Sequence, residues 1–226
     1  MHFSIIIPVF NEGQNIINLI NEIYETLLDY NFEIIVINDK STDDTKTNIT
    51  QLKNKYSNLI LVNNKNNSGQ SLSIYYGIKF AKSSTIVTLD GDGQNNPKDI
   101  KNLFQNYVNN KDVYLVGGVR KKRNDSFLKI ISSKIANKIR DFFLRDGCPD
   151  TGCGIKVFDK NIFLNFSFFD GIHRFLPALF VRNGYKCIYI HVDHRERKYG
   201  NSNYGTFKRA ISGISNIVKI IYITKK

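Results

Sequence analysis

Cysteine is scarce in this sequence, which has Cys148, Cys153 and Cys187 in 226 residues. An odd and sparse set does not make the disulfide framework of a small secreted protein, so it fits a reducing compartment. Cys148 and Cys153 lie close together in CPDTGC, but no second Cys/His pair follows at zinc-finger spacing. We therefore expect buried free thiols rather than disulfides or a zinc site.

Long apolar runs are also missing. A membrane-spanning helix needs about 18–20 apolar residues, and the closest stretch, ISGISNIVKIIYITKK at the C-terminus, is interrupted by Asn216 and Lys219. The N-terminal MHFSIIIPVFNE has no basic start and is broken by Pro8 and Glu12, unlike a signal peptide. We expect a protein that is soluble or lies on a membrane without crossing it.

Acidic residues are few in the second half of the chain. Residues 1–118 hold 10 Lys and Arg against 12 Asp and Glu, whereas residues 119–226 hold 22 against 8. This asymmetry, within a net charge of +12, favours an anionic partner for the second half, such as a phosphate-bearing substrate, a membrane surface or nucleic acid. The alternative is a basic face that only keeps the protein soluble.

Hydrophobic residues make up 42% of the sequence and aromatic residues 12%, which is typical of a globular protein. Short apolar runs, each about as long as a strand buried on both faces, recur along the first half. They are Phe3–Val9, Phe32–Ile37, Leu59–Val62, Thr85–Leu89 and Val113–Val116. Helical patterns separate them at Asn15–Leu28, Thr42–Tyr56 (with Ser41 as the expected N-cap and Asp43 and Asp44 in its first turn), Gln70–Lys82 and Lys98–Val108. This alternation predicts a doubly wound parallel sheet.

The second half has a different character. A long basic amphipathic helix is predicted over Ser126–Leu144, and the glycine-rich DGCPDTGCG follows it. Further elements are predicted at Ile155–Phe158 (strand), Phe175–Val181 (helix) and Cys187–Val192 (strand), with a final helix from Thr206. We expect an α/β fold, a mostly parallel Rossmann-like sheet flanked by helices with amphipathic helices at its C-terminal end. The halves 1–118 and 119–226 are expected to be continuous in a single domain.

Polar clusters follow three of the predicted strands: Asn11 and Glu12 after the first, NDKSTDD after the second, and DGDGQ after the fourth. Ligands of parallel sheets bind outside the carboxyl ends of the strands, so these clusters are expected to meet. Asp90 and Asp92 offer the hard oxygen ligands that Mg²⁺ or Mn²⁺ prefers, with Gln94 beside them. A bare D-x-D in a surface loop is a common turn, but its place at a strand end favours a metal site.

Two further charged positions border the same edge. Asp39 can accept hydrogen bonds from a base or ribose, or can form an Asx-turn that leads into the helix capped by Ser41. Arg120 is the first of four cations in GGVRKKR, and it stands closest to the end of the fifth strand. A charge run is usually a solvated face, but here one or two of its members are placed to meet phosphate.

The motifs IIIPVFNE, EIIVINDKSTDDT, LDGDGQNNP, GGVR, DTGCGIKVF and HRERKYGNSNYG occur in this order over nearly the whole chain. In order and spacing the sequence resembles family 2 glycosyltransferases. Within them it is most similar to the dolichyl- and polyprenyl-phosphate sugar synthases, which include dolichol-phosphate mannosyltransferase. The resemblance implies a GT-A fold, a nucleotide-sugar donor linked to UDP or GDP, and Mg²⁺ or Mn²⁺ as cofactor.

Carried over by position, the resemblance implies three sets of site residues. The nucleotide-sugar set is Pro8, Phe10, Glu12, Ile37, Asp39, Asp90, Gly91 and Asp92, and the metal set is Asp90, Asp92 and Gln94. The acceptor-phosphate set is Arg120, Lys129, Arg174, Arg197 and Ser202, and the catalytic residues are Asp92, Arg120, Asp150 and Arg197. The chain departs from the family pattern at Asn38, at Lys129 (usually arginine) and at Asn203 (usually lysine), which affects affinity and donor identity more than reaction type.

Taken together, these features predict a metal-dependent inverting transfer of a sugar to polyprenyl phosphate at the cytoplasmic face of an anionic membrane. A phosphate monoester is largely dianionic at pH 7, so it attacks without a general base. A rival on the same fold glycosylates a hydroxyl of a saccharide or glycolipid, and Asp150 is then the candidate base. A remote alternative is a basic nucleic-acid-binding module. It lacks a recognised motif and a stacking arrangement of aromatics, so no nucleic-acid partner is expected.

Overall fold

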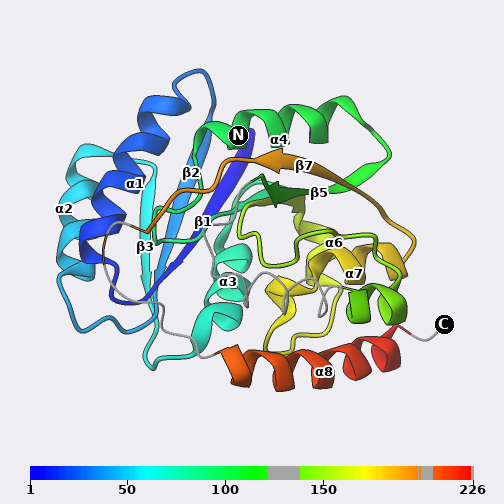
Figure 1. The fold of residues 1–226 in the computed structure, drawn as a ribbon. Coiled ribbons are helices and arrows are strands. Elements are labelled where there is room, and N and C mark those ends of the chain that lie inside the picture. Colours follow the sequence, from blue (N-terminus) through cyan, green and yellow to red (C-terminus); the bar gives the residue numbers. More distant parts are fainter. Residues whose placement is uncertain (122–137, 198, 200–205, 225–226) are drawn as a thin grey trace.

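The structure, a computed structural model, describes residues 1–121, 138–197, 199 and 206–224, and in the last range it omits the side chains of 206–212 and 214. Its centre is a seven-stranded sheet with the strand order β3-β2-β1-β4-β6-β5-β7 (Figure 1). The strands are β1 (Phe3–Val9), β2 (Phe32–Asn38), β3 (Leu59–Asn63), β4 (Thr85–Thr88), β5 (Val113–Arg120), β6 (Lys156–Asp159) and β7 (Lys186–Val192). Strands from both halves of the chain share this sheet.

The sheet is mostly parallel, with one antiparallel strand inside it. Strands β1 to β4 pair in parallel, and β5 pairs in parallel with β7. Strand β6 runs antiparallel between β4 and β5. The α/β expectation is therefore confirmed, and β6 adds a reversal that its apolar pattern alone does not reveal.

Helices cover both faces of the sheet, which explains why the strands read as continuous apolar runs. Ile5 and Ile7 of β1 pack on one face with helices α1, α2 and α4, and Ile6 packs on the other with α3, α6, α7 and α8 (Figure 1). Alternate strand residues thus serve two separate cores. The helices are α1 (Gly13–Thr26), α2 (Thr45–Lys55), α3 (Gly69–Phe80), α4 (Lys98–Asn109), α6 (Lys160–Leu164), α7 (Leu176–Arg182), α8 (Thr206–Ile223), the 3₁₀ turn η1 (Ile172–Arg174) and a helical segment over 138–144.

The predicted start of α2 is wrong. The helix begins at Thr45, not at Thr42, and Ser41 does not cap it. Ser41 Oγ instead accepts the backbone N–H of Asn11, 3.0 Å away, and Thr45 Oγ1 accepts that of Glu12 at 2.9 Å. Because these hydroxyls bind the loop that follows β1, tertiary contacts replace the local capping that the sequence suggests.

Strand β5 is longer than predicted. It continues through Gly117 and Gly118 to Arg120, so Arg120 is its last residue rather than part of the loop beyond it. A Cβ on Gly118 would lie 2.8 Å from Cys153 Sγ, so the neighbouring turn packs directly on the strand backbone. Of the helix predicted over Ser126–Leu144, residues 138–144 are helical and 126–137 lie outside the described residues.

The expectation of free thiols is confirmed. Cys148 and Cys153 are buried and Cys187 is half-buried, all without a disulfide. Burial raises the pKa of the Cys148 and Cys153 thiols to about 11, so they stay protonated and unreactive at neutral pH. In the part of the chain that the structure describes, no helix is both long and apolar enough to span a bilayer.

Gly77 sets how closely α3 approaches the sheet. A Cβ at this position would lie 2.6 Å from the side chains of both Ile6 and Ile37. We expect Gly77→Ala to lower the free energy of unfolding by about 1–3 kcal/mol, since overpacking a filled core forces it to shift. Urea denaturation measures this change.

The matched control is Gly213→Ala in α8. Apart from the backbone of α8 itself and the two sequence neighbours, no atom of the described residues lies within 4 Å of the added Cβ. Alanine has the higher helix propensity, so this variant should be neutral or more stable by up to about 1 kcal/mol. Equal destabilisation of the two variants would contradict the packing argument.

Candidate active site

The loops after β1 and β2 are joined by hydrogen bonds at the carboxyl edge of the sheet. Asp43 accepts the backbone N–H of Gly13 at 3.0 Å, in addition to the bonds that Ser41 and Thr45 make to the first loop. Asn11 adopts a left-handed conformation, with φ of 55°, and its side-chain oxygen accepts the N–H of Thr42 at 2.8 Å. The first two polar clusters therefore form one surface, as expected.

Asp39 is buried and organises the start of α3. Its Oδ1 accepts from Asn64 Nδ2 and from the backbone N–H of Ser68, and its Oδ2 accepts from the N–H of Gly69, each at 2.8 Å. A carboxylate accepts about four hydrogen bonds, so these three leave capacity for a ligand. The Asx-turn into α2 is wrong as the local role of Asp39, because the residue holds the first turn of α3 instead.

Asp90 lies in a closely fitted cradle at the end of β4. Gln70, in the first turn of α3, donates from Nε2 to Asp90 Oδ1 at 2.8 Å. A Cβ on Gly154 would lie 2.0 Å from Asp90 Oδ2, so only glycine leaves room for this carboxylate. Burial and the charge of Asp92 raise the pKa of Asp90 to about 6, and the positive charges of Lys156 and Arg120 oppose the increase.

Asp92 and its neighbours form the rim of this cradle. Gly91 allows close packing, since a Cβ there would lie 2.5 Å from Val9 Cγ1 and 3.1 Å from the Pro8 carbonyl oxygen. Asp92 Oδ1 accepts the backbone N–H of Gln94 at 3.0 Å, and Gln94 Nε2 donates to the Arg195 carbonyl at 3.2 Å. The third polar cluster thus reaches the basic loop that follows β7.

The donor set at this point suits a hard divalent cation. Asp90 and Asp92 supply carboxylate oxygens, and among the described residues no group of three His, Cys, Asp or Glu side chains stands together as a complete metal cage. Mg²⁺ and related ions are commonly held by one or two carboxylates, with water and phosphate oxygens at the other positions. The two aspartates therefore fit such an ion, and the amide of Gln94 stays a predicted additional ligand.

Arg197 lies across two acidic residues from separate parts of the chain. Its Nη2 bonds to Glu12 Oε1, and its Nη1 is 3.8 Å from Asp92 Oδ2. Glu12 also accepts from Asn15 Nδ2 at 2.7 Å. Burial raises the pKa of Glu12, and the bonds from Asn15 and Arg197 offset part of that increase. The loop after β7 is thereby fixed to the end of β1.

Arg120 and Asp150 form a bidentate ion pair. Arg120 Nε lies 2.6 Å from Asp150 Oδ2, and Nη2 lies 2.7 Å from Oδ1, with both side chains largely buried. A Cβ on Gly152 would lie 2.9 Å from Arg120 Nη2, so the glycine-rich turn passes directly under the guanidinium. The geometry gives Asp150 an orienting role, because both of its oxygens already accept from Arg120.

Other predicted site residues lie elsewhere or outside the described residues. The side chain of Ile37 is fully buried beneath Gly77 of α3, so the structure does not bring it to this surface. Phe10 is half-buried at the end of β1, and Arg174 packs with its guanidinium carbon 6.0 Å from the ring centre of Phe175. Lys129 and Ser202 lie outside the described residues.

The structure adds site residues that the sequence patterns missed. Gln70 contacts Asp90 from the helix after β3, and Asn15 contacts Glu12 from the first turn of α1. Lys156 is a buried cation at the start of β6. Its only signal in the sequence is a charged residue that opens an otherwise apolar strand. Arg195 forms a second bidentate pair, with Glu22 of α1, at 2.6 and 2.7 Å.

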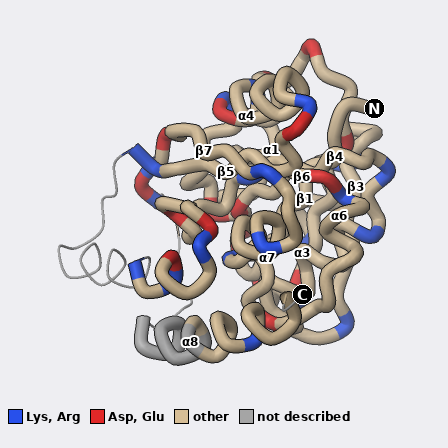
Figure 2. Tube along the Cα trace, turned by 90° about the vertical axis from the view of Figure 1, so that its right-hand side faces the viewer, with Lys and Arg blue, Asp and Glu red and all other residues tan. Residues whose placement is uncertain are grey.

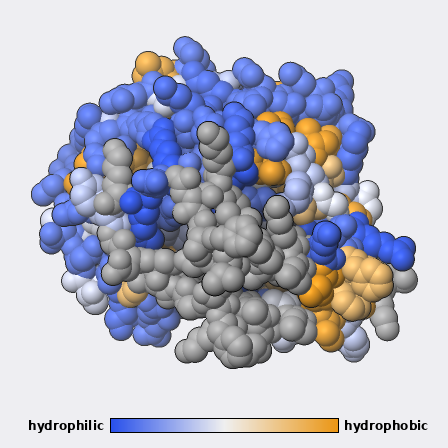
Figure 3. Space-filling view, viewed as in Figure 1, coloured by the Kyte–Doolittle hydropathy of each residue, from blue (hydrophilic) through white to orange (hydrophobic). Residues whose placement is uncertain are grey.

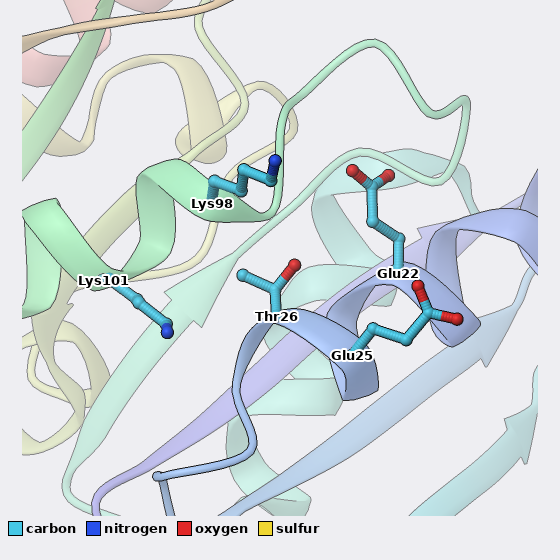
Figure 4. Close-up of a pocket in the computed structure, with 5 residues that line it drawn as sticks. All are labelled: Glu22, Glu25, Thr26, Lys98 and Lys101. Carbon is cyan, nitrogen blue, oxygen red and sulfur yellow. The ribbon is translucent and has the colours of Figure 1, made fainter.

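A hollow of about 570 Å³ opens between α1 and α4, but it contains none of the predicted site residues. Figure 4 shows its lining of Glu22, Glu25, Thr26, Lys98 and Lys101, which mixes both charges. A smaller hollow of about 60 Å³ lies beside Asp92 and Gly93, bounded by α1 and Arg195. The larger hollow is therefore separate from the predicted site, and the smaller one adjoins it.

Known structures with a similar fold carry nucleotides. The chain superposes on glucosyl-3-phosphoglycerate synthase from Mycobacterium tuberculosis, solved with Mn²⁺, UDP and phosphoglyceric acid, with a TM-score of 0.75 at 16% identity over 98% of this chain and 78% of that one. For a mannosyltransferase from Pyrobaculum calidifontis, solved with GDP-Man and Mn²⁺, the TM-score is 0.69 at 17% identity over 96% and 64%. These likenesses show the fold, which is that of GT-A glycosyltransferases.

Sequence comparison identifies the family. The chain is 29% identical to the dodecaprenyl-phosphate galacturonate synthase of Rhizobium johnstonii, over 100% of this chain and 68% of that protein. It is 31% identical to the undecaprenyl-phosphate 4-deoxy-4-formamido-L-arabinose transferase of Aeromonas hydrophila, over 89% and 62%. Residues 4–166 match the model of glycosyl transferase family 2. With the GT-A fold and the paired aspartates at the end of β4, this match shows that the chain belongs to glycosyl transferase family 2.

Proposed function

We propose that this protein transfers a sugar, with inversion, from a nucleotide-sugar donor to a polyprenyl phosphate. The observation that carries the proposal is the convergence of Asp90, Asp92, Arg197 and the Arg120–Asp150 pair at one edge of the sheet. The names of the similar proteins support it, since each names a polyprenyl phosphate and a sugar. The sugar and the base of the donor are left open.

The carboxylates would bind the nucleotide-sugar donor and its metal ion. Asp90 and Asp92, with Gln94, would hold Mg²⁺ or Mn²⁺ against the donor diphosphate, and the ion would stabilise the charge that develops on the leaving group. Asp39 keeps one hydrogen-bonding position for the nucleoside, beside Pro8, Phe10 and Glu12. The M. tuberculosis and P. calidifontis structures support this arrangement, since both hold Mn²⁺ with a nucleotide.

The cations would bind the phosphate of the acceptor. Arg120 and Arg197 border the aspartates, and a phosphate that lies between them would be oriented toward the donor sugar. The dianionic phosphate is itself the nucleophile, so no side chain has to remove a proton. Direct attack breaks the bond between the sugar and the diphosphate as the new bond forms on the opposite face. Lys129, Arg174 and Ser202 remain proposed contacts of this phosphate.

Transfer to a sugar or lipid hydroxyl is the alternative, and it would need Asp150 as the base. Both oxygens of Asp150 accept from Arg120, at 2.6 and 2.7 Å, which leaves this carboxylate poorly placed to take a proton. The geometry therefore favours the phosphate acceptor. A nucleic-acid module without turnover does not explain the cradle around Asp90.

The proposed function also places the protein on an anionic membrane. The segment 138–144 exposes Ile139, Phe142 and Phe143, with Phe142 77% exposed, and α8 exposes Val218 and Tyr222. Figure 3 shows apolar surface above the C-terminal end of α8, and Figure 2 shows α8 along the lower edge of the molecule from another direction. The exposed Lys138, Arg145 and Lys219 accompany these apolar residues. We infer that this face docks at the cytoplasmic leaflet, where lipid phosphate is accessible.

Helix α8 has one side that packs into the protein and another side that is exposed. Ile217 and Ile220 are buried in the core that α8 shares with α3, α6 and α7, whereas Val218 and Tyr222 are exposed. Packing into the protein and contact with a membrane are thus divided between two sides of one helix. Removal of the whole helix would unfold part of the core, so single surface side chains make the better test.

The direct test of the function is a transfer assay with a panel of UDP- and GDP-sugars, Mn²⁺ or Mg²⁺, and a short-chain polyprenyl phosphate. Asp92→Asn should lower the rate by roughly 100-fold or more, since a metal ion contributes several kcal/mol to the transition state. Asp112→Asn is the control, because Asp112 forms an exposed ion pair with Lys186. The polyprenol of the same length and a free sugar test the rival acceptor, and transfer to either one but not to the phosphate would refute the proposal.

Gly154→Ala should impair metal binding without unfolding the protein. The new Cβ would lie 2.0 Å from Asp90 Oδ2, and the carboxylate, as the end of a side chain, can move away more easily than the backbone can. We expect the affinity for Mn²⁺, measured by calorimetry, to fall by about tenfold or more. Circular dichroism checks the fold. Unchanged Mn²⁺ affinity in a folded variant would show that Asp90 is not a ligand.

Membrane docking is tested by co-sedimentation with phosphatidylglycerol vesicles at low salt. The double change Phe142→Ser and Phe143→Ser should lower the bound fraction about tenfold, since two exposed aromatic rings lose their apolar burial in the interface. Leu28→Ser is the matched control, because Leu28 is 81% exposed at the end of α1. An equal loss in both variants, or no binding of the unaltered protein, would exclude docking through this face.

A further inference from the structure

Lys156 is a buried cation in the site, and the proposed mechanism does not yet use it. It is the first residue of β6 and is only 4% exposed. Because β6 runs antiparallel to β4, it begins at the edge where β4 ends, and Lys156 pairs with Thr88, two residues before Asp90. The reversal of one strand therefore places a positive charge beside the paired aspartates.

The turn that precedes Lys156 is fitted to Asp90. Thr88 Oγ1 donates to the Gly154 carbonyl at 2.8 Å, and the α-carbon of Gly154 lies against the Asp90 carboxylate. The ammonium of Lys156 donates to the Cys153 carbonyl. An ammonium has three donors, and this is its one hydrogen bond among the described residues. Burial of a lysine ammonium with one hydrogen bond costs free energy unless a nearby negative charge compensates it.

The two arginines of the site bond to other carboxylates, although Arg197 also lies 3.8 Å from Asp92. Arg120 is held by Asp150 through two bonds, and Arg197 bonds to Glu12. Lys156 and Arg120 both lower the pKa of Asp90, but Arg120 is paired with Asp150. Lys156 forms no ion pair within the described part of the chain, so its charge is the one left to balance Asp90.

We propose that Lys156 is a positioning residue that serves as the internal counter-cation of Asp90, as Arg197 does for Asp92. Its charge holds the Asp90 carboxylate in place at the end of β4 before a divalent ion arrives. The same charge weakens the binding of that ion alone, so that tight binding awaits the negative diphosphate of the donor. The inference rests on the proposed function, because it takes the two aspartates as the metal site.

The test measures Mn²⁺ binding by calorimetry in the absence of nucleotide and acceptor. The pH is kept well above the pKa of Asp90, because removal of the Lys156 charge raises that pKa further and a protonated carboxyl does not bind the ion. Lys156→Met keeps the length and apolar stem of the side chain but removes its charge. Mn²⁺ should then bind at least roughly tenfold more tightly, because a nearby positive charge repels a divalent ion strongly even at an effective dielectric constant of about 20. Lys156→Gln keeps a donor for the Cys153 carbonyl and should behave like Lys156→Met. Lys156→Arg keeps the charge and should stay within about twofold of the unaltered protein.

Lys160→Met is the matched control. Lys160 follows the same strand and also donates to a backbone carbonyl, that of Ala81, but it lies at the opposite end of β6. It should leave Mn²⁺ binding unchanged. A purely structural role for Lys156 predicts weaker or unchanged Mn²⁺ binding on its removal, so an increase in affinity distinguishes the two roles.

Weaker or unchanged Mn²⁺ affinity in folded Lys156→Met and Lys156→Gln would overturn the inference while leaving the proposed function intact. If these variants unfold without metal, saturating Mn²⁺ should refold them, since the ion supplies the missing positive charge. Failure to refold contradicts the inference. An unaltered protein that binds neither Mn²⁺ nor UDP or GDP would overturn the proposed function, and this inference with it.

Discussion

The close packing around the half-buried Asp90 side chain at the end of β4 is the constraint on which the site depends. A negative charge at such a position costs free energy unless hydrogen bonds and opposite charges compensate it. Gln70 of α3 donates a hydrogen bond to it, and Lys156 of β6 and Arg120 of β5 add positive charge, so three separate elements provide this compensation. The site at Asp90 therefore depends on the relative positions of three elements, because each of them contributes a hydrogen bond or a charge to this one carboxylate.

Two glycines, Gly91 and Gly154, allow the close packing around this aspartate. At Gly91 a side chain would meet the end of β1, and at Gly154 it would meet the carboxylate itself. Both glycines serve close approach rather than flexibility. The Asp-Gly-Asp sequence is thus a packing solution as well as a donor set, because the small middle residue lets both carboxylates face the same edge of the sheet.

Each of three arginines in or beside the site forms an ion pair with a different carboxylate. Arg120 is oriented by Asp150, Arg197 by Glu12 and Arg195 by Glu22, so each guanidinium is fixed by one carboxylate and keeps part of its positive field for a ligand. Two of these pairs join the loop after β7 to α1 or to the turn before it. A nucleotide and an acceptor that carry phosphate would enter a site whose cations are already positioned.

Much of this protein could be predicted from its sequence. Apolar runs such as Phe3–Val9 have the length of doubly buried strands, and the polar residues that follow them mark the carboxyl edge of the sheet, so the α/β fold and the location of Asp90 and Asp92 follow from local patterns. The antiparallel direction of β6, the pairing of Arg197 with Glu12 and the use of Ser41 to bind the loop after β1 emerged only in the tertiary structure. The physical reason is range. Periodicity and strand ends are encoded by neighbouring residues, whereas Arg197 and Glu12 are 185 positions apart and meet only because the packed sheet brings them together.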